Sequence, residues 1–251
     1  MNTVAVVNQK GGVGKTTVTL GLAAAAQAAG ARVLVVDLDP QASSTWVLGH
    51  DPAEVGRSAA EVLAKGGARQ AIVASTWGAE VDLLPAAGRL QAKESTNGTA
   101  RLQSALGEVA PGYDAVLIDC PPSLGGLTIN ALSAADHALM VVEPSALSLR
   151  GISALADLVD RVWGDSNAGL DLAGVIVNKV PPVSAEADRR YEELTRIVGK
   201  RAVWQPPIPQ RVIVNQAIAE RAPIHAYGAR AGEVTSAFDQ LWRKLKRVIK
   251  R

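Results

Sequence analysis

The most constraining feature of this chain is a glycine-rich loop that follows its first apolar run. Residues 4–17 read VAVVNQKGGVGKTT, so the glycines lie between an expected strand and an expected helix. Glycines let the backbone wrap closely around an anion, and the N-terminus of the following helix adds free N–H groups and a positive dipole end. We therefore predict a phosphate-binding loop in which Lys15 supplies charge to the outer phosphates and the Thr16 hydroxyl binds Mg²⁺.

A second lysine distinguishes this loop from an ordinary P-loop. The usual pattern has glycine five residues before the Gly-Lys pair, whereas this chain has Gln9 there, followed by Lys10. The string resembles the deviant Walker A motif of the ParA/MinD ATPases, KGGxGKT followed by Thr or Ser. Under that resemblance the loop residues that bind nucleotide are Lys10, Gly11, Gly12, Val13, Gly14, Lys15, Thr16 and Thr17. An ordinary mononucleotide kinase is the alternative, and Lys10 argues against it.

Composition limits the class of protein. The 251 residues are 48% hydrophobic, which is enough for one α/β domain with a sizeable core over residues 1–251. The sequence contains no run of eighteen apolar residues and no signal-like charge pattern, so we expect a cytoplasmic protein. A single cysteine, Cys120, excludes a disulfide framework and is expected to be a small buried residue. It also disfavours a nitrogenase iron protein, whose bridging iron–sulfur cluster needs two cysteines per subunit.

Helix and strand patterns alternate along the chain, which is typical of parallel strands joined by crossover helices. The strands are expected at residues 4–8, 32–37, 81–85, 115–119, 137–142 and 172–178. The helices are expected at residues 17–29, 99–109, 127–134, 149–163, 185–198 and 231–250, with short helices between 43 and 80. The predicted fold is a doubly wound α/β layer, a mostly parallel sheet flanked by helices. Ligands of such folds bind beyond the carboxyl ends of the strands.

Carboxylates follow two of these strands. Residues 33–41 read VLVVDLDPQ, which contains Asp37 and Asp39, and the apolar strand at 115–119 ends in Asp119, a Walker B pattern. Phosphoryl transfer needs an acid that holds Mg²⁺ and a group that orients the attacking water. The resemblance implies that Asp39 orients the water and that Asp119 supports the metal together with the loop threonine. Strand-end aspartates are also common helix caps, and Asp37 fits either a cap or a supporting role.

The resemblance also implies how an ATP site is completed. In the family the signature lysine, here Lys10, reaches the nucleotide of a partner subunit, so ATP is held between two face-to-face protomers. Lys10, Lys15 and Asp39 are then the catalytic residues. ATP and Mg²⁺ are the implied cofactors, and the active species is an ATP-dependent homodimer.

Two downstream segments extend the resemblance. Residues 174–179 read GVIVNK, a strand that ends in Asn178, where the family has an asparagine that contacts adenine. An amide can both donate to and accept from an adenine edge. Pro207, Ile208 and Pro209 match the family loop that packs beside the base, and a helix follows that ends in a turn at residues 221–228. A plain strand end and a plain proline-rich loop are the alternatives.

The carboxyl end of the chain is strongly basic. Six cations fall within the last nine residues, and without them the chain has 20 basic against 24 acidic residues. One face of the expected helix at 231–250 is apolar, formed by Phe238, Leu241, Trp242, Leu245, Val248 and Ile249. The opposite face is rich in Lys and Arg. This pattern fits a helix packed on the core with cations facing DNA phosphates, and it also fits a helix in a membrane surface.

The family contains several functions, and we expect a DNA partition (segregation) ATPase of the ParA kind. In that reading an ATP-bound sandwich dimer binds DNA without sequence preference, and a centromere-binding adaptor protein stimulates hydrolysis on the nucleoid. The segments DPQ and ADHALMVVEPS resemble segregation ATPases, and the chain begins at its P-loop strand, so no helix-turn-helix is expected. The candidate DNA-binding residues are Arg189, Arg190, Arg211, Arg221, Arg243, Lys244, Arg247 and Lys250. A MinD-like membrane ATPase and a metabolic synthase of the dethiobiotin synthetase type are the alternatives.

Overall fold

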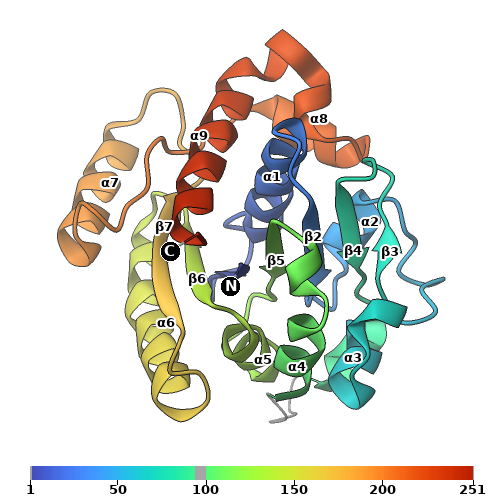
Figure 1. Ribbon diagram of the computed structural model, residues 1–251. Coiled ribbons are helices and arrows are strands. Elements are labelled where there is room, and N and C mark those ends of the chain that lie inside the picture. Colours follow the sequence, from blue (N-terminus) through green and yellow to red (C-terminus); the bar gives the residue numbers. More distant parts are fainter. Residues whose placement is uncertain (1, 94–99, 251) are drawn as a thin grey trace.

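The computed structural model describes residues 2–93 and 100–250. Its central sheet has the strand order β3-β4-β2-β5-β1-β6-β7 (Figure 1). The strands are β1 (Thr3–Val7), β2 (Val33–Asp37), β3 (Val73–Ala74), β4 (Val81–Leu84), β5 (Ala115–Asp119), β6 (His137–Val142) and β7 (Asp171–Val177). All neighbouring strands pair in parallel except β3 and β4. The prediction of a mostly parallel α/β sheet is therefore confirmed.

Helices cover both faces of this sheet. They are α1 (Lys15–Ala28), α2 (Ser43–Val47), α3 (Ala59–Lys65), α4 (Ala100–Gly107), α5 (Gly126–Ala134), α6 (Ala146–Asp165), α7 (Ala185–Val198), α8 (Val212–Ala219) and α9 (Gly232–Val248). The described residues also contain the 3₁₀ segments η1 (Ala68–Gln70), η2 (Gly88–Lys93), η3 (Ala110–Gly112) and η4 (Ile224–Ala231). Among the described residues no helix is long and apolar enough to span a bilayer.

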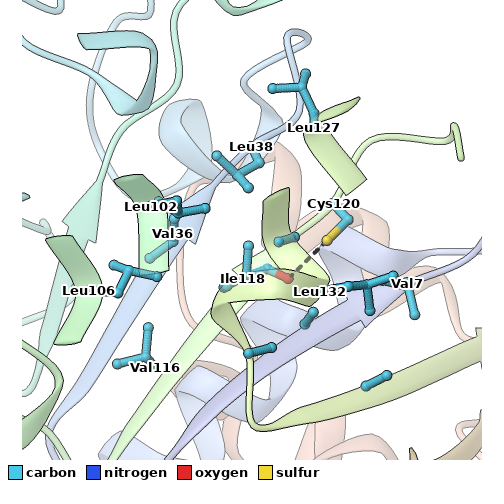
Figure 2. Packing of buried hydrophobic residues seen from close by; sticks show 14 of the residues in the cluster. Val7, Val36, Leu38, Leu102, Leu106, Val116, Ile118, Cys120, Leu127 and Leu132 are labelled. Atoms are coloured by element: carbon cyan, nitrogen blue, oxygen red, sulfur yellow. Dashed lines mark hydrogen bonds between the residues drawn. The ribbon is translucent and has the colours of Figure 1, made fainter. Parts of the chain in front are cut away.

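Successive side chains of the strands supply two separate cores. On β1, Val4 and Val6 pack with α1 and α9, whereas Ala5 and Val7 pack with the helices of the other face. This alternation follows from the two-residue period of a strand, and burial of both faces explains why the strand sequences are continuously apolar. Figure 2 shows the second core, in which Leu102 and Leu106 of α4 lie near residues of β2 and β5. Cys120 is buried there, as expected.

The C-terminal helix α9 packs its apolar face against α1 (Figure 1). Phe238, Leu241, Trp242 and Leu245 are each at most 2% exposed. The two helices approach closely because α1 has a glycine at the contact: a Cβ atom added to Gly21 would lie 2.1 Å from the Phe238 ring. The apolar face predicted from the sequence is thus part of the core.

The expected helix and strand boundaries differ from the structure mainly at their ends. The helix expected at 149–163 begins three residues earlier, at Ala146, and ends at Asp165. The helix expected at 99–109 is α4, and its expected first residue, Thr99, lies outside the described residues. Short helices occur between 43 and 80 as predicted, but β3 in that stretch was not anticipated, since two residues carry no periodic signal.

Candidate functional site

The glycine-rich loop joins β1 to α1 at the carboxyl edge of the sheet. Gly14 is the N-cap of α1 and has a left-handed backbone, with φ of 91°. This backbone conformation disfavours any residue with a side chain. There is also no room for one, because an added Cβ atom would lie 2.2 Å from the amide nitrogen of Asn178. The loop therefore presents its backbone, rather than side chains, to the space above the helix. This is the arrangement that phosphate groups need at a helix N-terminus.

Lys15 occupies the first turn of α1 and is only 6% exposed. Its Nζ lies 3.5 Å from the Lys10 carbonyl oxygen. Burial lowers the pKa of the Lys15 ammonium, while the negative charges of Asp119 and Asp39 favour the protonated form. A buried cation with few partners is costly unless an anion compensates it. Lys15 is thus suited to a phosphate ligand.

The Walker B carboxylate lies beside the loop threonine. The Oδ2 atom of Asp119 accepts hydrogen bonds from Thr16 Oγ1 at 2.8 Å and from Ser44 Oγ at 2.7 Å. Its Oδ1 atom is buried and has no hydrogen-bond partner among the described residues. Burial raises the pKa of Asp119 to about 6, and the two hydroxyl groups oppose this shift. An unsatisfied carboxylate oxygen next to a hydroxyl fits the oxygen ligands that Mg²⁺ prefers.

The two aspartates that follow β2 have different surroundings. Asp37 is fully buried opposite Asp119 in the sheet register and accepts hydrogen bonds from Thr45 N and Oγ1, at 2.8 and 2.7 Å. Burial, and then the charge of Asp119, raise the pKa of Asp37 to about 8. The Thr45 contacts join Asp37 to the first turn of α2. Asp39 is half-buried at the edge of the site, and its Oδ1 accepts from the Gln41 backbone N–H at 2.9 Å.

The signature lysine makes contacts within its own protomer. The Nζ atom of Lys10 forms an ion pair with Glu143, which follows β6, and lies 3.3 Å from Ser145 Oγ. Its backbone N–H donates to Asn8 Oδ1 at 2.7 Å. The side chain is about one-third exposed, at 32%. The role of Lys10 across a dimer interface stays a prediction.

The residues expected to contact the adenine base lie in two places, one against the loop and the others in a cavity. Asn178 is 2% exposed and donates from Nδ2 to the Val13 carbonyl at 2.9 Å, so this amide supports the loop, and its adenine contact stays a prediction. Pro207 and Pro209 line a cavity of about 430 Å³ together with Pro181 and Pro182. The side chain of Ile208 does not line it, because it is 1% exposed and packs in the core beneath.

Three of the candidate DNA-binding cations form ion pairs, and a fourth lies over an aromatic ring. Arg189 and Arg190 on α7 form ion pairs with Glu186, and Arg190 also pairs with Glu193. Arg211 pairs with Glu233. The Arg221 guanidinium instead lies over the Trp46 ring, 5.2 Å from its centroid. These four side chains are therefore partly committed to contacts within the protein.

Three other candidates gather at one place, which we call the basic groove. It is a cavity of about 510 Å³ lined by Arg201, Arg243, Lys244 and Arg247, between α9 and the segment that follows α7. Within residues 2–93 and 100–250 none of these four forms an ion pair. The Lys244 ammonium lies over the Trp204 ring at 5.0 Å, and partial burial lowers its pKa. Lys250 lines a separate cavity.

Several of these contacts were not anticipated from the sequence. The contacts of Ser44 with Asp119, of Glu143 with Lys10, of Lys179 with the loop and of Arg201 in the basic groove were not predicted. Glu143 and Lys179 lie in segments that carry the family resemblance, but the resemblance implied no role for either. Each is brought to its partner by strand order or helix packing, so no local sequence signal marks it.

Comparisons with known proteins show which proteins this chain is similar to. A family model described as an AAA domain matches residues 1–172. The sporulation initiation inhibitor protein Soj of Bacillus subtilis is 34% identical, over 91% of this chain and 92% of its own length. The chromosome partitioning protein ParA of Myxococcus xanthus is 33% identical, over 91% of this chain and 82% of its own length. The crystal structure of cobyrinic acid a,c-diamide synthase from Mycobacterium smegmatis, with bound ADP and magnesium, has a TM-score of 0.82 and 31% identity and covers 99% of this chain and 95% of that one.

Proposed function

The chain belongs to the ParA/MinD family of deviant Walker A ATPases, and we propose that within this family it is an ATP-dependent DNA partition ATPase. The observation that carries the proposal is the pairing of the loop with the end of β5: the loop holds buried Lys15, and its Thr16 donates a hydrogen bond to Asp119 of β5 at the carboxyl edge of the sheet. In this proposal an ATP-bound homodimer binds DNA without sequence preference on the nucleoid. A centromere-binding adaptor protein then stimulates hydrolysis and release.

The nucleotide and metal assignments rest on residues that fit them. Residues 10–17 supply the backbone cradle and the buried ammonium, and Thr16 with Asp119 supplies the metal ligands. Bound Mg²⁺ would neutralise charge on the outer phosphates. The M. smegmatis protein, which is crystallised with ADP and magnesium, supports this assignment through its overall likeness. Asn178, Pro207 and Pro209 lie at the same end of the sheet, where a base would be bound.

Asp39 is assigned to the hydrolytic step. Its half-buried carboxylate lies at the edge of the site, and the Gln41 N–H holds one of its oxygens. The other oxygen is then available to accept a hydrogen bond from an attacking water and so orient it. Lys10 would leave Glu143 and reach the nucleotide of the partner subunit when two protomers close face to face.

DNA binding is assigned to the basic groove. Its four cations form no ion pair among the described residues, so their charge is available to phosphate groups. The two arginines of α7 and Arg211 already face glutamates, which lowers their contribution to the surface potential. A dimer doubles the number of grooves on the assembly, so ATP-dependent dimerisation would strengthen DNA binding without any change in the groove.

Burial of the α9 apolar face disfavours the membrane alternative. A membrane-surface helix must present Trp242, Leu245 and Ile249 to lipid. In this structure all three are at most 8% exposed and pack in the core with α1. Insertion would therefore remove α9 from the core and expose to water the apolar side chains of α1 that it covers, at a cost of roughly 1.5–3 kcal/mol for each large side chain so exposed.

One experiment decides between DNA and membrane. We expect gel-shift binding to unrelated DNA duplexes with ATP but not with ADP, and a linear log–log fall between about 50 and 200 mM salt. Anionic phosphatidylserine vesicles should not sediment the protein under the same conditions. Lys15→Ala is the control, because it removes nucleotide binding and leaves the basic groove intact. ATP-dependent sedimentation with vesicles, without any DNA shift at low salt, would replace the DNA assignment with the membrane alternative.

A further inference from the structure

Two consecutive residues after β7 hold the backbone of the glycine-rich loop. Asn178 donates from Nδ2 to the Val13 carbonyl at 2.9 Å, and Lys179 donates from Nζ to the Gly12 carbonyl at 2.5 Å. Strand β7 is separated from β1 by β6, so the contact crosses the sheet at its carboxyl edge. Lys179 itself is exposed, apart from this contact. Nothing in the motifs of the loop or in the proposed chemistry accounts for it.

The direction of these two carbonyl groups determines where the loop N–H groups point. A trans peptide unit is planar, and its C=O and N–H groups point to opposite sides. The Gly12 carbonyl belongs to the same peptide unit as the Val13 N–H, and the Val13 carbonyl to the same unit as the Gly14 N–H. Holding both carbonyl oxygens toward β7 therefore turns both N–H groups the other way. A phosphate cradle needs successive N–H groups on one side.

The backbone conformation of Lys179, just after β7, is one that its neighbouring contacts must stabilise. Lys179 has φ of 57°, a left-handed conformation that is disfavoured for a residue with a Cβ atom. Such conformations persist where neighbouring contacts require them, and they gather at functional sites. On the loop side, Gly14 leaves no room for a methyl group beside Asn178. The end of β7 and the loop therefore pack closely, and each has a backbone conformation that suits this contact.

We propose that Lys179 is a positioning residue for the nucleotide phosphates. It holds the Gly12 carbonyl so that the loop amides stay turned toward the phosphate chain before the nucleotide arrives. The proposal rests on the nucleotide site proposed above and adds a residue to it. Because Lys179 acts through the loop, it should affect every ligand that places phosphates there, whatever base the ligand carries.

The test compares substitutions of Lys179 with the same change elsewhere. Lys179→Met keeps the length of the side chain and removes the donor, Lys179→Arg keeps a donor, and Lys65→Met makes the same change on the exposed end of α3. Calorimetry with Mg-ATP, Mg-ADP and Mg-tripolyphosphate measures affinity. We expect Lys179→Met to weaken all three ligands by about tenfold, as for loss of one exposed charge-assisted hydrogen bond. Lys179→Arg should recover most of the loss, and Lys65→Met should bind as wild type.

Urea unfolding without ligand separates positioning from stability. The midpoint of Lys65→Met should equal that of wild type, and the midpoint of Lys179→Met should be at most slightly lower, because one exposed hydrogen bond contributes little to the free energy of unfolding. If Lys179→Met fails to fold, Lys179→Gly replaces it, since glycine accepts the left-handed backbone, and the same loss of affinity is expected.

Three results would overturn the proposal. The first is wild-type affinity of Lys179→Met for all three ligands. The second is a loss for ATP and ADP with none for tripolyphosphate, which would place Lys179 at the base or ribose. The third is a loss of affinity matched by a lower urea midpoint and not recovered by arginine. A wild-type protein that binds none of the ligands, or binds them independently of Lys15, would instead refute the proposed nucleotide site.

Discussion

The glycine-rich loop and the basic groove both gather positive charge, but they do so in opposite ways. In the loop one ammonium, that of Lys15, is 6% exposed among backbone groups and carboxylates. In the basic groove four cations stand at the surface, and only Lys244 is partly buried. Interactions in the buried site are strengthened by the low local dielectric, whereas those in the groove are screened by water and salt. One substitution in the loop should therefore abolish nucleotide binding, whereas one substitution in the basic groove should only weaken DNA binding.

The largest effect is expected for the rate of ATP hydrolysis at the loop site. Asp39→Ala should reduce ATP hydrolysis on the order of a hundred- to thousandfold, because no group orients the attacking water. ATP affinity should change little, and the protein should accumulate as an ATP-bound dimer. Phosphate release and sedimentation with ATP measure the two properties. Hydrolysis at the wild-type rate would remove Asp39 from the catalytic residues.

The next largest effect concerns binding in the buried site. Lys15→Ala should lose about 3 kcal/mol of ATP binding, the cost of removing a buried charged hydrogen-bond partner. Thr16→Ala should weaken Mg-ATP more than metal-free ATP, since its hydroxyl lies beside Asp119. Calorimetry with and without Mg²⁺ tests both. Unchanged affinity in both variants would show that the loop is not the phosphate site.

Lys10 also lies in the loop, but unlike Lys15 its side chain is one-third exposed. Lys10→Ala should bind ATP with nearly wild-type affinity yet fail to form a stable dimer, because its contact is made with the partner's nucleotide. Glu143→Gln is the matched change, since it releases Lys10 from its ion pair without removing the lysine. It should leave dimerisation equal or stronger. Wild-type dimerisation of Lys10→Ala in sedimentation with ATP would exclude a role for this lysine across the interface.

The smallest effect per residue is expected in the basic groove. Changing Arg243, Lys244 and Arg247 to glutamine should lower the log–log salt slope of DNA binding by about 0.9 for each phosphate that is no longer neutralised. ATP affinity and dimerisation should not change. The control removes the same charge from α7, by changing Arg189, Arg190 and Arg196 to glutamine, because these arginines already face glutamates. Equal slopes in the two variants would show that pairing does not decide which cations meet DNA.

Local patterns of residues were enough to predict the loop, the sheet and the apolar face of α9. Residues 10–17 are contiguous, and their glycines and helix start determine the backbone conformation of the proposed phosphate cradle. The continuous apolar strands and the helical period of the last helix are likewise local patterns, and burial in the structure confirms both. Such features are predictable because a few neighbouring residues are sufficient to specify them.

Which polar groups of different segments meet, in contrast, depended on how the chain folds. The ion pairs of α7 join glutamates and arginines three or four residues apart, so the spacing along one helix accounts for them. No such local pattern brings Arg201 of the segment after α7 to the same cavity as Lys244 of α9. Nor does one place Ser44 on Asp119 or Lys179 on Gly12, because these contacts join segments that are 75 and 167 residues apart. Strand order and helix packing set those distances. The electrostatic energy of a charged side chain depends on its distance to other charges and on its burial, and neither is a property of the local sequence.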